Sequence, residues 1–136
     1  MLSVYLICVG KLKEKFYLEA AAEYQKRLSA YCRLTLVELP EEKLPPSASV
    51  VALCVEGKER SSEDFAKLLS TWEHSSAKHL VFVIGGSYGL DPALKAEAWV
   101  RLSMSPMTFP HHLARVMLLE QLYRAFKIQE GASYHK

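Results

Sequence analysis

The sequence lacks the cysteine pattern of a disulfide framework or a zinc site. Its three cysteines, Cys8, Cys32 and Cys54, form no CxxC pair, and each lies in or beside an apolar run. An odd number of cysteines in apolar segments is typical of buried, reduced thiols. No group of His, Cys, Asp and Glu has the spacing of metal ligands, so the sequence predicts no metal site.

Long hydrophobic runs and an excess of one charge are also lacking. No apolar stretch approaches the roughly 20 residues that span a bilayer. The apolar N-terminal segment has no basic region before it, unlike a signal peptide. We therefore expect a cytoplasmic protein with no membrane partner. The formal net charge is only +2, which permits a nucleic-acid partner without requiring one.

The chain does contain apolar, strand-like runs that alternate with amphipathic segments. Its 136 residues, half of them hydrophobic, suit one domain over 1–136. Strands are expected at residues 2–9, 33–39, 50–55, 80–84 and from 100 towards 109. Helices are expected from the lysines of 11–15 to about 31, from a cap at Ser61 or Ser62 to about 72, after a cap at Asp91, and over 111–129. This alternation predicts an α/β domain with a mostly parallel sheet of about five strands flanked by helices.

Two of the expected helices have informative faces. The first helix has an apolar, largely aromatic stripe at steps of three to four residues, which we interpret as core packing. The stripe consists of Phe16, Ala20, Tyr24, Leu28 and Tyr31. The last helix is apolar on more than one face, which a small monomer does not bury easily. This predicts a dimer interface.

Three loops that follow strands carry the unusual chemistry, at residues 53–57, 85–89 and 103–111. Ligands in open α/β folds gather at the carboxyl ends of strands, so these loops form one site if their strands are neighbours. Gly85 follows a buried strand and lets a ligand approach the backbone, although a tight turn explains it equally well. The loop has neither GxGxxG spacing nor the lysine of a phosphate loop, which excludes a nicotinamide enzyme of the Rossmann type.

The last helix and the C-terminus hold the titratable candidates. His111 follows Pro110 at a helix start and is either a proton acceptor or a first-turn residue satisfied by the loop. Cations along the helix form either a solvated face or a set of phosphate contacts. These cations are Arg115, Arg124 and Lys127. The terminal Tyr134–His135–Lys136 is either a frayed end or a tail that closes over a site.

Several segments together resemble the SPOUT methyltransferases of the RlmH type. The segments VGKLKEKF, EGKERSSEDFA, FVIGGSYGL, LSMSPMTFPH, EQLYRAFKI and YHK occur in the family's order. The resemblance covers nearly the whole chain and is most specific in its last third. It implies a homodimer with a deep trefoil knot in its C-terminal half. It also implies S-adenosylmethionine-dependent methylation of N3 of a pseudouridine in a 23S ribosomal RNA stem-loop, on the assembled ribosome.

The same resemblance assigns roles to individual residues. The implied cofactor pocket consists of Leu53, Gly85, Met104, Ser105, Pro106, Met107, Thr108 and Phe109. For catalysis, His135 or His111 would accept the N3 proton, and Arg124 or Lys136 would stabilise the anion. Tyr134 belongs to the tail, which is expected to reach the substrate side of the partner subunit's site.

Two departures from the family pattern leave alternatives open. The connection at 41–49 is much shorter than in typical members, and Pro106 stands where a lysine is common. The proline removes one amide donor. The alternatives are a SPOUT methyltransferase that acts on another RNA, and a catalytically inactive RNA- or cofactor-binding module of the same fold.

Overall fold

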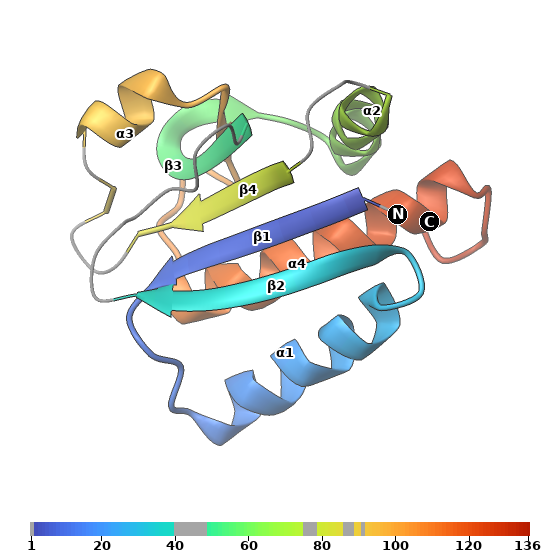
Figure 1. Cartoon of the computed structure of the whole chain (residues 1–136), viewed down its shortest axis with the longest axis horizontal. Helices are drawn as coiled ribbons and strands as arrows, with labels where there is room; N and C mark the ends of the chain where they lie inside the picture. Colours follow the sequence, from blue (N-terminus) through green and yellow to red (C-terminus); the bar gives the residue numbers. More distant parts are fainter. Residues whose placement is uncertain (1, 40–48, 75–78, 86–88, 91) are drawn as a thin grey trace.

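Five strands form one sheet in which every described pair is parallel. The computed structural model describes residues 2–39, 49–74, 79–85, 89–90 and 92–136. The sheet has the order β2-β1-β4-β3-β5 (Figure 1). Its strands are β1 (Leu2–Val9), β2 (Cys32–Leu39), β3 (Ser49–Glu59), β4 (His79–Ile84) and β5 (Val100–Ser103). The predicted α/β architecture with a parallel, five-stranded sheet is confirmed.

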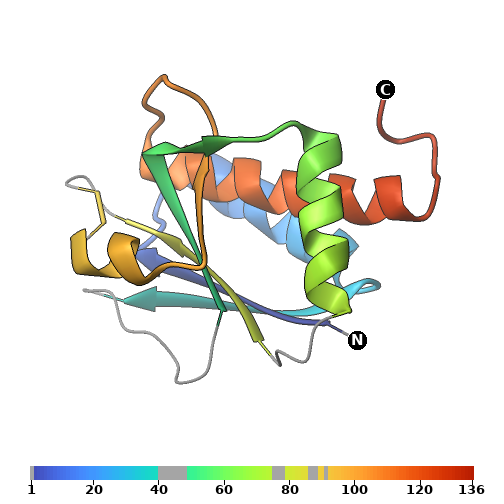
Figure 2. The same cartoon turned by 90° about the horizontal axis from the view of Figure 1, so that it is seen from above.

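The helices cover the two faces of the sheet unequally. They are α1 (Lys15–Leu28), α2 (Ser62–Glu73), α3 (Pro92–Glu97) and α4 (His111–Gln129). Helices α1, α2 and α4 lie on one face and the short α3 lies on the other (Figure 2). Of the two predicted caps of α2, Ser61 is the one used, because its Oγ accepts from the Asp64 amide at 3.0 Å. The predicted cap Asp91 and most of the predicted 41–49 loop lie outside the described residues.

The apolar runs are continuous because the sheet is buried on both faces. In β4, Leu80, Phe82 and Ile84 pack into the core beneath α1, α2 and α4. The alternate residues Val81 and Val83 pack into a smaller cluster on the α3 side. Within the described chain, no helix is long and apolar enough to cross a membrane.

The strands that border the pocket differ from their predicted lengths. β3 continues past residue 55 to Glu59, and Leu102 of β5 pairs with both Leu53 and Lys58 across a register shift. Gly57 lies in this curl, where a Cβ would come within 2.7 Å of the Arg101 carbonyl carbon. β5 ends at Ser103 instead of continuing towards 109, because side-chain hydroxyls there bond to the local backbone in place of a neighbouring strand. These bonds join Ser103 Oγ to the Ser105 carbonyl at 3.1 Å and the Met107 amide to Ser105 Oγ at 3.0 Å.

The predicted core stripe of α1 is wrong at its first two residues, Phe16 and Ala20, neither of which belongs to the core cluster. Phe16 is 64% exposed. The packed face instead runs through Tyr17, Ala21, Tyr24 and Leu28, whose spacing of three to four residues keeps them on the side that meets α4. One position of sequence places Phe16 about 100° away from Tyr17 on the helix.

All three cysteines are free, as predicted. Cys8 and Cys32 are buried, and burial raises the pKa of each thiol to about 11. Cys54 is only half-buried, since it lies where β3 begins to curl away from the sheet. The two buried thiols therefore act as small apolar core residues.

Candidate functional site

The carboxyl ends of β3, β4 and β5 enclose a pocket of about 690 Å³. These strands are neighbours in the sheet, so the predicted convergence of the three loops is confirmed. The predicted cofactor residues that line it are Leu53, Gly85, Met104, Ser105, Met107, Thr108 and Phe109. Pro106, which was predicted with them, is not among the lining residues.

Gly85 is required by a close approach of two backbone segments. A Cβ at this position would lie 2.6 Å from the Gly89 carbonyl carbon and 2.9 Å from the Leu90 nitrogen. Gly89 itself has a φ of +79°, in the left-handed region that favours glycine. The first loop glycine therefore serves a tight turn and also leaves backbone facing the pocket, so the two readings of this loop are compatible.

An ion pair forms a polar rim on an otherwise largely apolar pocket. Lys95 of α3 donates to Glu56 at the curl of β3 at 2.5 Å, and both residues line the pocket. This hydrogen bond lowers the pKa of Glu56 and raises that of Lys95. The two residues are 39 positions apart in the sequence, and no sequence pattern identified them.

His111 contributes an imidazole to the pocket from the first turn of α4. Burial lowers its pKa, and the neighbouring charges of His112 and Arg115 lower it further. Within the described residues, its ring makes no hydrogen bond. The neutral imidazole is therefore the stable form near neutral pH, and its nitrogens are available to accept a proton.

Arg115 is buried, which contradicts the prediction of a solvated face. It is 3% exposed, and its NH1 donates to Glu38 Oε2 at 2.9 Å. The same oxygen accepts the Leu12 amide at 2.7 Å. Burial raises the pKa of Glu38, but the Leu12 amide and Arg115 more than offset this and lower it overall. Sequence reasoning missed Glu38, although an acidic residue near the end of an apolar strand was a usable signal.

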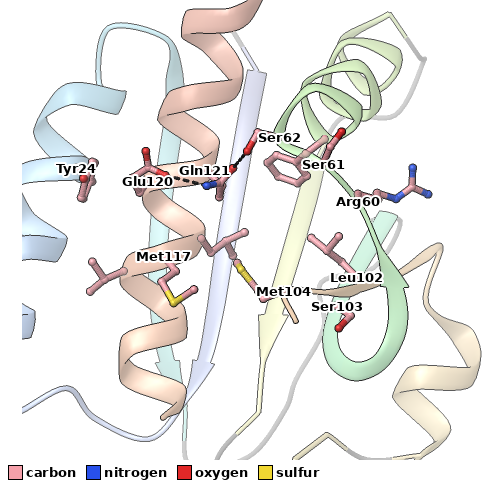
Figure 3. A pocket seen from close by; sticks show the side chains of 13 residues that line it. Tyr24, Arg60, Ser61, Ser62, Leu102, Ser103, Met104, Met117, Glu120 and Gln121 are labelled. Carbon is pink, nitrogen blue, oxygen red and sulfur yellow. Dashed lines mark hydrogen bonds between the residues drawn. The ribbon is translucent and has the colours of Figure 1, made fainter. Parts of the chain in front are cut away.

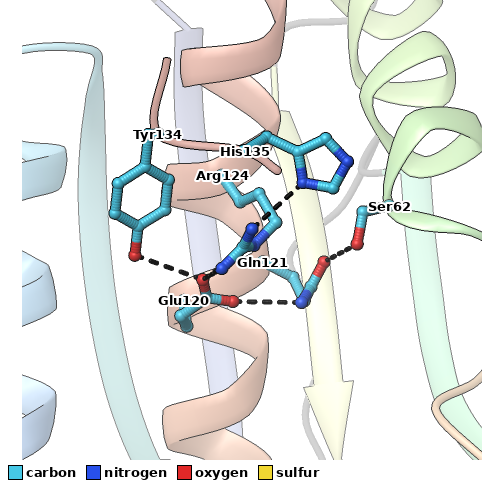
Figure 4. Close-up of polar contacts among 6 residues, drawn as sticks. All are labelled: Ser62, Glu120, Gln121, Arg124, Tyr134 and His135. Carbon is cyan, nitrogen blue, oxygen red and sulfur yellow. Dashed lines mark hydrogen bonds and ion pairs between the residues drawn. The ribbon is translucent and has the colours of Figure 1, made fainter. Parts of the chain in front are cut away.

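The tail docks against α4 and α2 instead of fraying. The Arg124 guanidinium donates to His135 Nδ1 at 3.0 Å (Figure 4). The opposite ring nitrogen, Nε2, lies 2.6 Å from Glu63 Oε1. Glu120 Oε1 accepts from Arg124 at 2.7 Å and from the Tyr134 hydroxyl at 3.3 Å. Arg124, Tyr134 and His135 therefore form one polar cluster, and both nitrogens of His135 are engaged in it.

Arg124 of this tail cluster lies in the C-terminal half of α4, whereas His111 of the pocket lies in its first turn. Figure 1 shows the two ends of α4 on opposite sides of the molecule. The 13 residues from His111 to Arg124 correspond to about 20 Å of helix. The structure of one chain therefore does not bring the predicted tail residues together with the predicted cofactor residues. The terminal Lys136 is exposed.

A groove of about 430 Å³ extends from the pocket towards the tail cluster. Leu102 and Met104 line both hollows, and Glu120 lines the far part of the groove (Figure 3). Val116 and Met117 of α4 are only half-buried along it. Within the part of the chain that the structure describes, no three His, Cys, Asp or Glu residues are placed to hold a metal ion.

Comparison with known proteins gives a consistent result over the whole chain. Residues 2–135 match the family model described as "Predicted SPOUT methyltransferase". The chain is 43% identical to the ribosomal RNA large subunit methyltransferase H of Bifidobacterium adolescentis, and 43% identical to that of Clostridium novyi. Both alignments cover 99% of this chain and 100% of the relative. The aligned length is 159 against the 136 residues of this chain, so the relatives contain residues that this chain lacks.

Solved structures support the fold. A probable methyltransferase from Bordetella pertussis matches with a TM-score of 0.60 at 14% identity, covering 90% of this chain and 93% of that one. A probable methylase family protein from Haemophilus influenzae matches with a TM-score of 0.59 at 11% identity, covering 98% of this chain and 70% of that one. At such low identity, these matches speak for the fold alone.

We expect His111 to titrate below its ordinary pKa of 6.5 in the folded protein. In NMR titration of the imidazole resonances, replacing His112 with Asn removes one of the charges that lower the pKa. The pKa of His111 should then rise while remaining below 6.5, because burial persists. As a control, Lys67→Ala alters an exposed residue of α2 and should leave the pKa of His111 unchanged. A pKa at or above 6.5 in the wild type contradicts this description of the pocket.

Proposed function

Because the chain belongs to the SPOUT methyltransferase family, we propose that it transfers a methyl group from S-adenosylmethionine to N3 of a pseudouridine. The substrate is a stem-loop of 23S ribosomal RNA, presented on the assembled ribosome. The observation that supports this most is the convergence of residues 53–56, Gly85 and 104–111 on one pocket. The relatives that align over the whole chain are named as ribosomal RNA large subunit methyltransferases.

The pocket has the properties that S-adenosylmethionine requires. Its volume lies within the usual range of about 300–1,000 Å³ for small-molecule sites. Leu53, Leu102 and Met104 offer apolar surface to the adenine faces, and the backbone beside Gly85 offers amides and carbonyls to its edges. Glu56 and Lys95 at the rim match the ammonium and carboxylate of the methionine portion. When bound, the cofactor supplies a methyl group on a sulfonium, which is already a good leaving group.

The protein must supply a base, because N3 of the uracil ring has to lose its proton to attack the methyl group. His111 fits this role, since it lines the pocket and is neutral near neutral pH. His135 fits less well in its docked position, because both of its ring nitrogens are bonded. Arg124 and Lys136 would then stabilise the N3 anion electrostatically.

A second copy of the chain is the proposed source of the tail in each site. Within one chain, about 20 Å of helix separates the tail cluster from His111. The groove between them is lined by half-buried apolar residues of α4 that a partner could cover. We therefore propose a cytoplasmic homodimer of single-domain chains. Each chain has a trefoil knot in its C-terminal half, and Tyr134 to Lys136 reach across to the partner's pocket.

The missing residues favour one alternative, a SPOUT methyltransferase that acts on another RNA. The relatives are longer, and a shortened surface can alter docking on the ribosome without touching the pocket. An inactive binding module of the same fold would retain the pocket and transfer no methyl group.

The decisive test is transfer of labelled methyl from S-adenosylmethionine to ribosomes that lack the modification, followed by mapping of the labelled nucleotide. We expect label on N3 of a pseudouridine in 23S RNA. Label on another RNA would support the alternative substrate. No transfer to any RNA, with the cofactor bound in a parallel calorimetric titration, would support the inactive module.

Replacing Gly85 with Val should weaken cofactor binding. The added side chain meets the Gly89 and Leu90 backbone, so the pocket wall must shift. We expect affinity to fall at least about tenfold, which corresponds to about 1.4 kcal/mol. Calorimetric titration with S-adenosylmethionine measures this. Gly131→Asn is the matched control, because nothing lies within 4 Å of a Cβ at Gly131 and Asn tolerates its positive φ. Equal affinity of wild type and Gly85→Val, both folded by circular dichroism, would remove this loop from the site.

Mixing two inactive variants tests whether the tail acts across the dimer. Deleting residues 134–136 should preserve cofactor binding and abolish transfer, whereas Gly85→Val, assayed at a cofactor concentration well below its weakened Kd, should transfer almost nothing through its own pocket. After subunit exchange, half of the dimers are mixed, and each has one intact pocket facing one intact tail. We expect about a quarter of the wild-type rate to return. If the tail acts within its own chain, the mixture remains inactive.

A further inference from the structure

The first turn of α1 carries an exposed aromatic ring among exposed lysines. Phe16 is 64% exposed and is the first large apolar residue of the helix. Lys13 and Lys15, on the chain just before it, are also exposed. Lys15 approaches Glu19 at 3.8 Å, but with side-chain exposures of 90% and 67% this ion pair contributes little. Both lysines therefore remain available to another anion.

A series of ring contacts links Phe16 to the pocket. The ring centroids of Phe16 and Tyr17 are 4.3 Å apart, those of Tyr17 and His112 are 6.4 Å apart, and those of His112 and His111 are 4.0 Å apart. His111 lines the pocket. The rings thus connect the surface of α1 with His111, the proposed general base, beside which the target nucleotide would bind. We call Lys13, Lys15 and Phe16 the α1 ledge.

The overall arrangement agrees with this path. The first turns of α1 and α4 lie at the same end of the molecule as the carboxyl ends of β1, β2 and β4 (Figure 1). The β1–α1 connection passes close to the pocket residue, since a Cβ at Gly10 would lie 3.8 Å from His111 Nε2. The ledge is therefore at the pocket end of the molecule, away from the tail cluster.

We propose that the α1 ledge binds single-stranded RNA beside the target nucleotide, with a flanking base stacked on Phe16 and phosphates on Lys13 and Lys15. This inference deepens the proposed function and rests on it. The chemistry favours RNA over a second copy of the chain. Aromatic platforms beside cations are the usual surface for unpaired bases and their backbone, whereas the centres of protein interfaces are depleted in lysine.

The test compares ledge variants with matched controls in steady-state methyl transfer to unmodified ribosomes. Phe16→Ala and the double change Lys13→Ala, Lys15→Ala should each raise KM for ribosomes about tenfold, since stacking and phosphate contacts both position the RNA. The kcat and the affinity for S-adenosylmethionine should not change. Leu18→Ala, an exposed apolar residue of the same helix, and Lys67→Ala on α2 are the controls. Neither control should alter KM.

A second probe separates failure of the ledge from failure of the proposed function. Binding of a short labelled oligouridine is followed by fluorescence anisotropy across a salt series. The double lysine variant should lower the log–log salt slope by about 1.4, or about 0.7 per phosphate contact. If the wild type modifies ribosomes and the ledge variants match it in both assays, the ledge inference is wrong and the proposed function survives. If the wild type modifies no RNA, the proposed function fails. If, in addition, all variants bind oligouridine equally well, the ledge inference is wrong too.

Sedimentation of the same variants tests whether a second copy of the chain, instead of RNA, binds at the ledge. If Phe16→Ala converts a dimer to monomer, the ledge is a contact between copies of the chain and the RNA inference is overturned. An unchanged oligomeric state together with weaker oligouridine binding supports it.

Discussion

Two close approaches between backbone segments determine the shape of the pocket. At Gly85 the end of β4 meets Gly89, and at Gly57 the curl of β3 meets Arg101 of β5, with virtual Cβ contacts of 2.6 and 2.7 Å. Neither approach is possible with a side chain present, so glycine at these positions draws three strand ends together. Beside Gly85 the pocket wall is therefore backbone, whose amides and carbonyls can recognise the edges of a flat heterocycle.

Helix α4 connects the pocket with β2, with helices α1 and α2, and with the C-terminal tail. Its first turn is held to the end of β2 by the buried Arg115 and Glu38, which places His111 at the pocket. Its middle packs between α1 and α2, and its last turns hold the tail through Arg124. Because the helix is rigid, the distance between pocket and tail is a property of its length. In the proposed homodimer, a second chain would bring two such ends together.

The parts of the fold that depend on local pattern were predictable from the sequence. The continuous apolar runs identified the buried strands, and the three loops after them converge as expected because parallel strands end at one edge of the sheet. The burial of Arg115 and the exposure of Phe16 were not predictable. A buried cation depends on a carboxylate 77 positions away, and a helical residue is packed or exposed according to where its neighbours lie. The curl of β3 likewise depends on Arg101, which no local pattern indicates.

Charged side chains near the tail are mostly paired, whereas the lysines at the start of α1 are exposed. At the tail end, Glu120 is paired with Arg124 and Glu130 with Lys127, and Glu63 lies within hydrogen-bonding distance of His135. Around the start of α1, the lysines are exposed and only weakly paired. Residues 11–15 carry three exposed lysines and one exposed glutamate, so this segment is locally basic although the net charge of the whole chain is only +2. Local fields of this kind guide a charged partner to one face even when the protein as a whole is nearly neutral. For the proposed ribosomal substrate, the exposed lysines would favour approach with the start of α1 facing the RNA.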